Sequence, residues 1–196
     1  VSGVLRAMYL PWLEETARRL QEAIKDAGGL PAMSVETLTP GTCVLFVDGL
    51  RYDVAIELQQ QLAGLGDISL STRWSSLPSV TASGKAWCSP VVEHIIGTVE
   101  DLVFEPRVAA NGKPLSSHHF RKLLSDQGIQ PLEKHETGDP QGQAWTETGD
   151  LDHYGHEHGM RLARDLDTQL IQVVERVHEL RDAGWQRIRI VTDHGW

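Results

Sequence analysis

Acidic and histidine residues stand at the ends of two predicted strands, where a metal site would need them. Residues 187–191 are a short β-branched run, and Asp193 and His194 follow it closely; the apolar run over residues 42–47 likewise leads into Asp48. At the carboxyl end of a parallel strand, side chains can line a site rather than a packed core. Carboxylate oxygens and imidazole nitrogens are ligands for divalent metal ions, so the pattern indicates a metal site. Taken singly, each acid is more commonly a turn or cap residue.

A second acid–histidine pair lies in the middle of the chain's C-terminal half. Asp152 and His156 flank Gly155, and His153 and His158 accompany them. These last two histidines can be solvated residues without a role in binding. Two ions about 4 Å apart in such mixed carboxylate–imidazole shells can bind both the entering and the leaving oxygen of a phosphate ester.

Hydrolysis at such a site also requires a nucleophile. A hydroxyl group close to the metal ion can serve, because the ion lowers the pKa of that group. The loop over residues 75–84 is rich in hydroxyl groups, and spacing alone does not choose among Ser75, Ser76, Ser79, Thr81 and Ser83. A hydroxyl-rich turn is often only a turn. Arg51 and Lys85 are cations that could bind a substrate phosphate, although Arg51 is equally suited to a solvated first turn of a helix.

Hydrophobic periodicity predicts the elements that must position these residues. Helices are expected over residues 11–27, with Pro11 at the start, and over residues 51–63 and 159–182. Strands are expected over residues 42–47, over the alternating stretch 68–74 and from residue 187 onward, with a helix after the hydroxyl-rich loop. A strand, a helix and a strand in succession favour a right-handed parallel crossover. The fold class is therefore predicted as α/β, a mainly parallel sheet flanked by helices.

The chain is predicted to hold one main domain. Residues 1–40 read as a helix and a linker, and residues 41–196 as the domain, with an insertion or cap over about residues 98–149 beside the active-site face. The chain begins Val-Ser-Gly and ends one residue after Asp193-His194-Gly195. A strand that ends in a functional motif normally continues into a helix and further strands. We therefore expect a fragment of a longer protein whose domain is C-terminally incomplete.

Composition narrows the functional classes. The 196 residues carry a formal net charge of −9, which argues against binding a nucleic-acid backbone through bulk charge. An acidic chain can still act on phosphate esters when metal ions supply local positive charge. Cys43 and Cys88 are too few for a disulfide framework. No apolar run reaches membrane-spanning length and no signal peptide opens the chain, so a cytoplasmic protein without a membrane partner is expected.

Four short patches resemble a known family. Residues 47–53, 77–81 and 192–196 resemble the PglZ family, which belongs to the alkaline-phosphatase superfamily and occurs in bacterial phage-resistance systems of the Pgl/BREX type. Residues 152–159 are similar to the Asp-x-x-Gly-His-x-x-Gly motif of nucleotide pyrophosphatases/phosphodiesterases in that superfamily. The resemblance covers about residues 42–196, and the four motifs follow the superfamily's order.

The resemblance implies an alkaline-phosphatase-like fold and a role for each motif residue. Asp48, Asp193 and His194 match the ligands of one metal ion, Thr81 matches the nucleophile that also touches it, and Asp152 and His156 match two ligands of a second ion. The superfamily supplies a further histidine to the second ion from beyond the point where this chain stops. The full-length protein is then expected to hold two divalent ions. Imidazole ligands favour zinc or manganese, and magnesium is tolerated.

One departure from the pattern concerns the residues after Thr81. Ala82-Ser83-Gly84 follows it, without the asparagine that phosphodiesterase relatives place there. Another group must then bind the phosphoryl oxygen, and Lys85 and a backbone N–H group are candidates.

The function expected from these motifs is a metal-dependent phosphodiesterase or phosphatase that forms a phospho-threonine intermediate. The resemblance suggests nucleotides or nucleic acid as substrates and other phage-defence proteins as partners. The alternative is a catalytically silent metal-binding scaffold or sensor in a defence complex, because a fold does not fix a function. A sulfatase or phosphomutase is disfavoured, since a threonine occupies the nucleophile position and Cys88 lies too far along the chain.

Overall fold

The chain divides into two compact units, Val1–Ser34 and Val35–Trp196. The computed structural model describes residues 2–29, 37–76, 79–97 and 105–195. Most of the linker predicted before residue 40 therefore lies outside the described residues. None of the described helices is long and apolar enough to cross a membrane.

The first unit is a single helix, α1 (Ser2–Asp26). The prediction that this helix begins at Pro11 was wrong, because Pro11 lies inside α1. Proline removes one backbone hydrogen bond, and good helix formers such as Leu, Met and Arg on the preceding residues compensate for that loss. Ion pairs one helical turn apart join Arg18 to Glu15 and Glu22 on the polar side of the helix.

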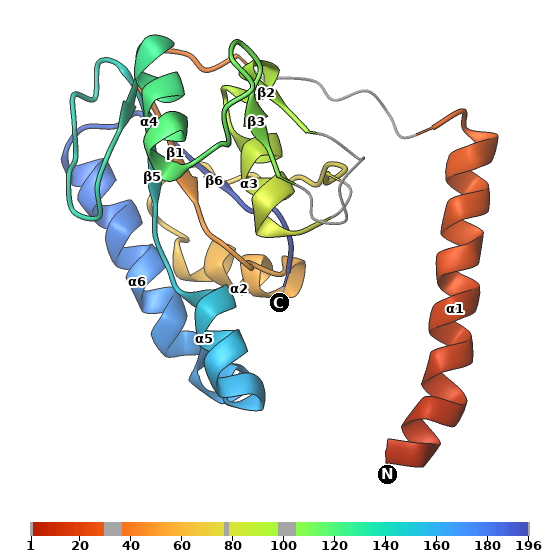
Figure 1. Cartoon of the computed structure of the whole chain (residues 1–196). Coiled ribbons are helices and arrows are strands. Elements are labelled where there is room, and N and C mark those ends of the chain that lie inside the picture. The colour runs from red at the N-terminus through yellow and green to blue at the C-terminus, as the bar shows by residue number, and fades with distance from the viewer. Residues whose placement is uncertain (1, 30–36, 77–78, 98–104, 196) are drawn as a thin grey trace. The chain divides into compact units, whose positions relative to one another are not determined.

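The second unit is built on a parallel sheet, shown in Figure 1. Its strands are β1 (Thr42–Phe46), β4 (Ile129–Pro131), β5 (Gln143–Glu147) and β6 (Arg187–Val191), in the order β4-β5-β1-β6. All three pairings are parallel. The predicted α/β fold with a parallel sheet flanked by helices is therefore confirmed.

Helices cover both faces of the sheet, and β1 is buried throughout as its unbroken apolar run predicts. Leu45 and Val47 pack in one cluster with buried residues of α2 (Tyr52–Gln61), α5 (Leu151–His158) and α6 (Leu162–Asp182). Val44 and Phe46 point to the opposite face, where they pack with Phe120 and Leu124 of α4 (Ser117–Asp126). Successive side chains of a strand alternate between faces, so β1 holds both layers together.

The remaining elements are short. Helix α3 (Thr81–Cys88) is followed by a 3-10 turn, η1 (Val92–His94), and by an antiparallel pair of two-residue strands, β2 (Ile95–Ile96) and β3 (Arg107–Val108). Another 3-10 turn, η2 (Gly159–Arg161), separates α5 from α6. The helix predicted over residues 159–182 therefore begins with a 3-10 turn and becomes α-helical at Leu162.

Two sequence predictions are corrected by the sheet. The stretch over residues 68–74 contains no strand, and Ile68, Leu70 and Trp74 are exposed, so the alternating pattern faces solvent rather than a core. The stretch over residues 98–149 was expected as an insertion or cap, yet its later part supplies β4 and β5 to the sheet. These strands escape a periodicity search because they are short and carry Gln130, Gln143 and Glu147 among their apolar residues.

Candidate metal centre

The strand register brings the predicted acids to one edge of the sheet. Phe46 at the end of β1 pairs with Glu147 at the end of β5 and with Val191 at the end of β6. Asp48 and Asp193 each follow two residues after these aligned positions, so both leave the sheet at its carboxyl edge. Ligand sites in open parallel sheets form at this edge.

Asp193 is buried against helix α3. It is 4 % exposed, and its Oδ1 accepts a hydrogen bond of 2.9 Å from the backbone N–H of His194. Its Oδ2 is buried and accepts no hydrogen bond from any described residue. Glycine is needed at position 84 for this approach, because a Cβ atom there would clash with Cβ of Asp193 and lie 3.2 Å from its Cγ. An orphaned carboxylate oxygen is costly to bury, and a cation is one group that would satisfy it.

Asp48, Asp193 and His194 form a three-residue cluster with metal-ligand chemistry. One ligand atom from each lies within 4.8 Å of the other two. Nε2 of His194 lies 3.4 Å from Oδ1 of Asp48 and 3.6 Å from Oδ2 of Asp193. Two carboxylates and an imidazole suit zinc or manganese, so the residues present fit the metal ion that the sequence predicted.

The hydroxyl group of Thr81 lies against the side chains of this cluster. Thr81 is the first residue of α3, and its Oγ1 lies 3.3 Å from both carboxylate oxygens of Asp48 and 3.0 Å from Nε2 of His194. Ser75 donates to the backbone carbonyl oxygen of Asp193, and Ser83 donates to that of Val80. Thr81 is thus a candidate nucleophile whose hydroxyl group contacts side chains of the cluster, and its role as the nucleophile stays a prediction.

Burial and crowded charge disfavour the ionised form of Asp48. Desolvation, then the carboxylates of Asp193 and Asp152, raise the pKa of Asp48 from its usual value near 3.8 to about 6, while His194 and Thr81 act in the opposite direction. A bound divalent ion would relieve the same repulsion between carboxylates. The electrostatics therefore agree with the geometry of the cluster.

Asp152 and His156 form a second pair near the cluster. Helix α5, which the sequence did not predict as a separate helix, places them one turn apart, with Nε2 of His156 3.4 Å from Oδ2 of Asp152. Asp152 packs closely on Gly49, where a Cβ atom would lie 2.9 Å from Cβ of Asp152. The imidazole of His156 is 73 % exposed. The pair borders the Asp48 cluster but is not part of its three-residue ligand group, and a second metal site remains a prediction.

The two predicted phosphate-binding cations have carboxylate partners. Nζ of Lys85 lies 2.7 Å from Oε2 of Glu147, and Nε of Arg51 donates to Oδ1 of Asp53 at 3.0 Å. Lys85 lines the pocket that contains Asp48 and Thr81, whereas Arg51 is not among the described residues lining that pocket. Lys85 is therefore placed beside Thr81 and Asp48, whereas Arg51 packs against Gly195, the residue after His194, and its role in substrate binding stays a prediction.

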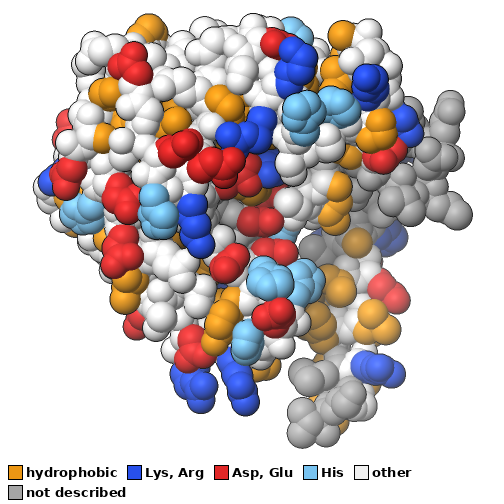
Figure 2. All heavy atoms as spheres, turned by 60° about the vertical axis from the view of Figure 1, so that its left-hand side comes forward, with side chains coloured by type: hydrophobic (Ala, Val, Ile, Leu, Met, Phe, Trp, Pro, Cys, Tyr) orange, Lys and Arg blue, Asp and Glu red, His pale blue; other side chains and the backbone are white. Residues whose placement is uncertain are grey.

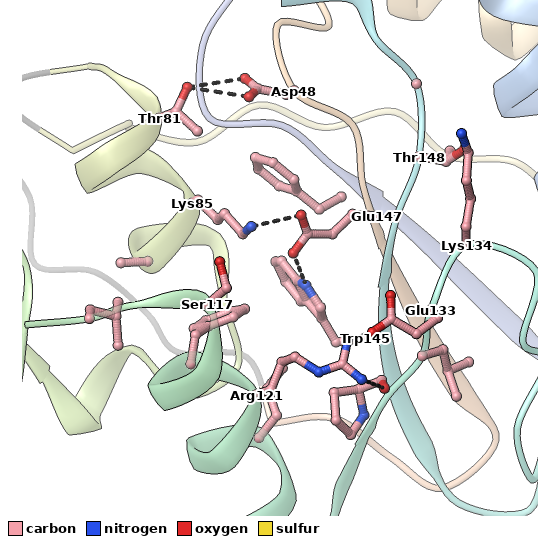
Figure 3. A pocket seen from close by; sticks show the side chains of 18 of the residues that line it. Asp48, Thr81, Lys85, Ser117, Arg121, Glu133, Lys134, Trp145, Glu147 and Thr148 are labelled. Atoms are coloured by element: carbon pink, nitrogen blue, oxygen red, sulfur yellow. Dashed lines mark hydrogen bonds and ion pairs between the residues drawn. The ribbon is translucent and has the colours of Figure 1, made fainter.

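A pocket of about 720 Å³ extends from Asp48 and Thr81 between α3 and α4. Figure 3 shows Lys85 and Glu147 next to the Thr81–Asp48 contact, with Trp145 beyond them and Arg121 at the far end. The aromatic side chains of Phe46, Phe120 and Trp145 are among those that line it. This volume is much larger than a phosphate group requires and would accommodate a sizeable ester group.

Sequence reasoning missed Glu147 and Arg121. Both belong to the stretch read as an insertion, so neither was placed near the sheet edge. Recognition of β5 as a strand would have identified Glu147, because it ends that strand just as Asp48 follows β1. On the face shown in Figure 2, acidic side chains gather centrally, with basic side chains beside them and histidines nearby.

Comparison of the chain with protein-family models, with curated proteins and with solved structures finds no match. The resemblance to the PglZ family therefore rests on the four sequence motifs.

Proposed function

We propose that the second unit is a metal-dependent phosphoric-ester hydrolase domain that uses Thr81 as its nucleophile. The observation that carries this proposal is the contact of Thr81 Oγ1 with both Asp48 and Nε2 of His194. A hydroxyl group beside two strand-end carboxylates and a histidine is the arrangement that metal-assisted phosphoryl transfer requires. The order of the motifs along a parallel sheet supports an alkaline-phosphatase-like fold of the PglZ type.

Asp48, Asp193 and His194 would hold the divalent ion, zinc or manganese by preference and magnesium as a further candidate. The ion would lower the pKa of the Thr81 hydroxyl group and offset negative charge on the substrate. Asp152 and His156 are the proposed protein ligands of a second ion.

Thr81 then provides the nucleophile. Its oxygen attacks phosphorus, the bond from phosphorus to the leaving oxygen breaks, and a phospho-threonine forms. Water next attacks phosphorus and the bond to Thr81 breaks, which restores the hydroxyl group and releases phosphate or its remaining ester. Thr81 is the first residue of α3, so the positive end of that helix stabilises the charge that develops.

The broader setting follows from the resemblance. We propose nucleotides or nucleic acid as the phosphate esters, the cytoplasm as the compartment and other phage-defence proteins as partners. A catalytically silent metal-binding scaffold or sensor is the second candidate. The scaffold or sensor is favoured by the pairing of Lys85 with Glu147, which neutralises a cation that lines the pocket with Thr81.

Hydrolysis of bis(p-nitrophenyl) phosphate tests the proposal. The protein is stripped of metal, zinc, manganese or magnesium is added back, and Thr81→Ala is assayed beside the wild-type protein. Metal-dependent turnover should fall at least about 100-fold in Thr81→Ala. Ser79→Ala is the matched control, because it removes an exposed hydroxyl group from the same loop. A folded protein that binds metal and shows no turnover would instead support the scaffold or sensor.

A further inference from the structure

Glu147 occupies a position next to the proposed nucleophile that the reaction scheme leaves without a role. It ends β5, in register with Phe46 of β1. Its Oε2 lies 2.7 Å from Nζ of Lys85, and its Oε1 accepts a hydrogen bond of 3.0 Å from Nε1 of Trp145. Both carboxylate oxygens are therefore engaged, which fixes the orientation of the side chain.

Lys85 is held from several sides at once. Its Nζ lies 5.7 Å from the ring centroid of Phe46 and 5.5 Å from that of Phe120, in addition to its ion pair with Glu147. Ammonium groups are attracted to aromatic ring faces. The side chains of Lys85 and Glu147 are 29 % and 44 % exposed, so the aromatic contacts and the Trp145 hydrogen bond, rather than full burial, constrain this ion pair.

Lys85 also lies one helical turn after Thr81 on α3. Side chains four residues apart stand on the same face of a helix, about 6 Å apart at Cβ. Figure 3 shows Lys85 and Glu147 in the same pocket as Thr81 and Asp48. A phosphate attacked by Thr81 would therefore bring its other oxygens toward the Lys85–Glu147 pair.

The charge of this pair determines which phosphate esters are favoured. A phosphodiester carries one negative charge, whereas a phosphomonoester carries nearly two near neutral pH because its second pKa is about 6. Glu147 neutralises the ammonium group that would attract the second charge, and its own carboxylate repels that charge. The pocket also has room for the second ester group of a diester.

We propose that Glu147 is a specificity-determining residue that disfavours phosphomonoesters by holding Lys85 in a neutral pair. This inference rests on the proposed hydrolase function. Glu147 selects by charge, and the pocket beyond it accommodates the additional ester group of the favoured substrate.

The substitution Glu147→Gln tests the charge directly. It retains the size of the side chain and a carbonyl oxygen for Trp145, and it releases Lys85 from its ion pair. We measure kcat/KM for bis(p-nitrophenyl) phosphate and for p-nitrophenyl phosphate with the same metal. The diester-to-monoester ratio should fall at least about tenfold in Glu147→Gln, and an unchanged ratio would overturn the proposal.

Two further variants keep the test specific. Glu133→Gln removes a carboxylate that pairs with Arg121 in the same pocket, and it should leave the ratio within about twofold. Lys85→Met leaves Glu147 unpaired and should shift the ratio in the opposite direction, further toward the diester. A shift of similar size in Glu133→Gln would show that the general charge of the pocket, rather than Glu147, sets the preference.

Binding of inorganic phosphate separates failure of this inference from failure of the proposed function. Calorimetry on the metal-free protein requires neither turnover nor a bound ion. Glu147→Gln should bind phosphate at least about tenfold more tightly than the wild-type protein. If hydrolysis is absent and phosphate binding still tightens, the hydrolase proposal fails and charge selection by Glu147 stands. If diester hydrolysis is present and both readouts are unchanged, the role of Glu147 fails alone.

Discussion

Oγ1 of Thr81 lies 3.0 Å from Nε2 of His194, although the two residues are 113 positions apart in the sequence. Thr81 begins a helix and His194 follows an edge strand of the described sheet, so the contact depends on the packing of α3 against the carboxyl edge. Asp48 lies on the same side, at 3.3 Å from Thr81 and 3.4 Å from His194. The centre is thus assembled from three segments that meet only in the folded chain.

Asp193→Asn should weaken metal binding. The amide retains the shape of the side chain but removes its negative charge. In the structure, Oδ2 of this carboxylate is buried without a hydrogen-bond partner among the described residues. We expect the affinity for zinc or manganese to fall at least about tenfold, as is typical when a metal ligand, or a residue that orients one, is replaced. Equilibrium dialysis measures this directly. Asp53→Asn, an exposed carboxylate paired with Arg51, is the control and should retain wild-type affinity.

The stability of the metal-free protein should decrease as the pH rises through the titration of Asp48. The pKa of Asp48 is raised from 3.8 to about 6, so the folded state retains this proton at pH values where the unfolded chain has lost it. The resulting stabilisation is fully present below about pH 4, and it is lost progressively as the pH rises through the folded-state pKa of about 6.

Chemical denaturation in a chelating buffer at pH 5 and pH 7 measures the effect. Asp48 should contribute a loss of about 1 kcal/mol between these values, after allowance for screening of a partly exposed group. Asp48→Asn should show a correspondingly smaller loss, which separates Asp48 from the other titrating groups. An identical pH dependence in the two proteins would contradict the assigned pKa. Added zinc should oppose the trend, because the ion binds ionised Asp48.

Gly84→Ala should destabilise the protein and disturb the centre. Its Cβ atom would lie 3.2 Å from both Cγ and Oδ2 of Asp193, a buried side chain with little room to move. We expect a loss of about 1–3 kcal/mol in the free energy of unfolding, despite the better helix propensity of alanine.

Urea denaturation, repeated with and without zinc, measures the effect of Gly84→Ala. The control is Gly3→Ala in α1, where the added methyl group meets nothing within 4 Å. Gly3→Ala should be neutral or slightly stabilising. A neutral result at Gly84 would show that α3 can move away from Asp193 at little cost.

Much of the centre could be predicted from local sequence. The apolar run of β1, the β-branched run of β6 and the stripe of α6 each identify an element by its periodicity. Strands of a parallel sheet share a carboxyl edge, so the acids that follow β1 and β6 could be expected to meet. The sequence therefore sufficed to predict that Asp48 lies close to Asp193 and His194.

Only the tertiary structure decided the remaining relationships. The alternation over residues 68–74 resembles a strand but is exposed, whereas polar-containing β5 is paired on both sides at the centre of the sheet. The hydrophobic periodicity of a segment indicates which face of it is apolar. It does not indicate which other element will pack against that face. The contact of Thr81 with Asp48 and His194, and the pairing of Lys85 with Glu147, arise where α3 packs beside the carboxyl edge of the sheet. Such contacts depend on how separate elements approach one another, and that approach is determined by packing of the whole domain.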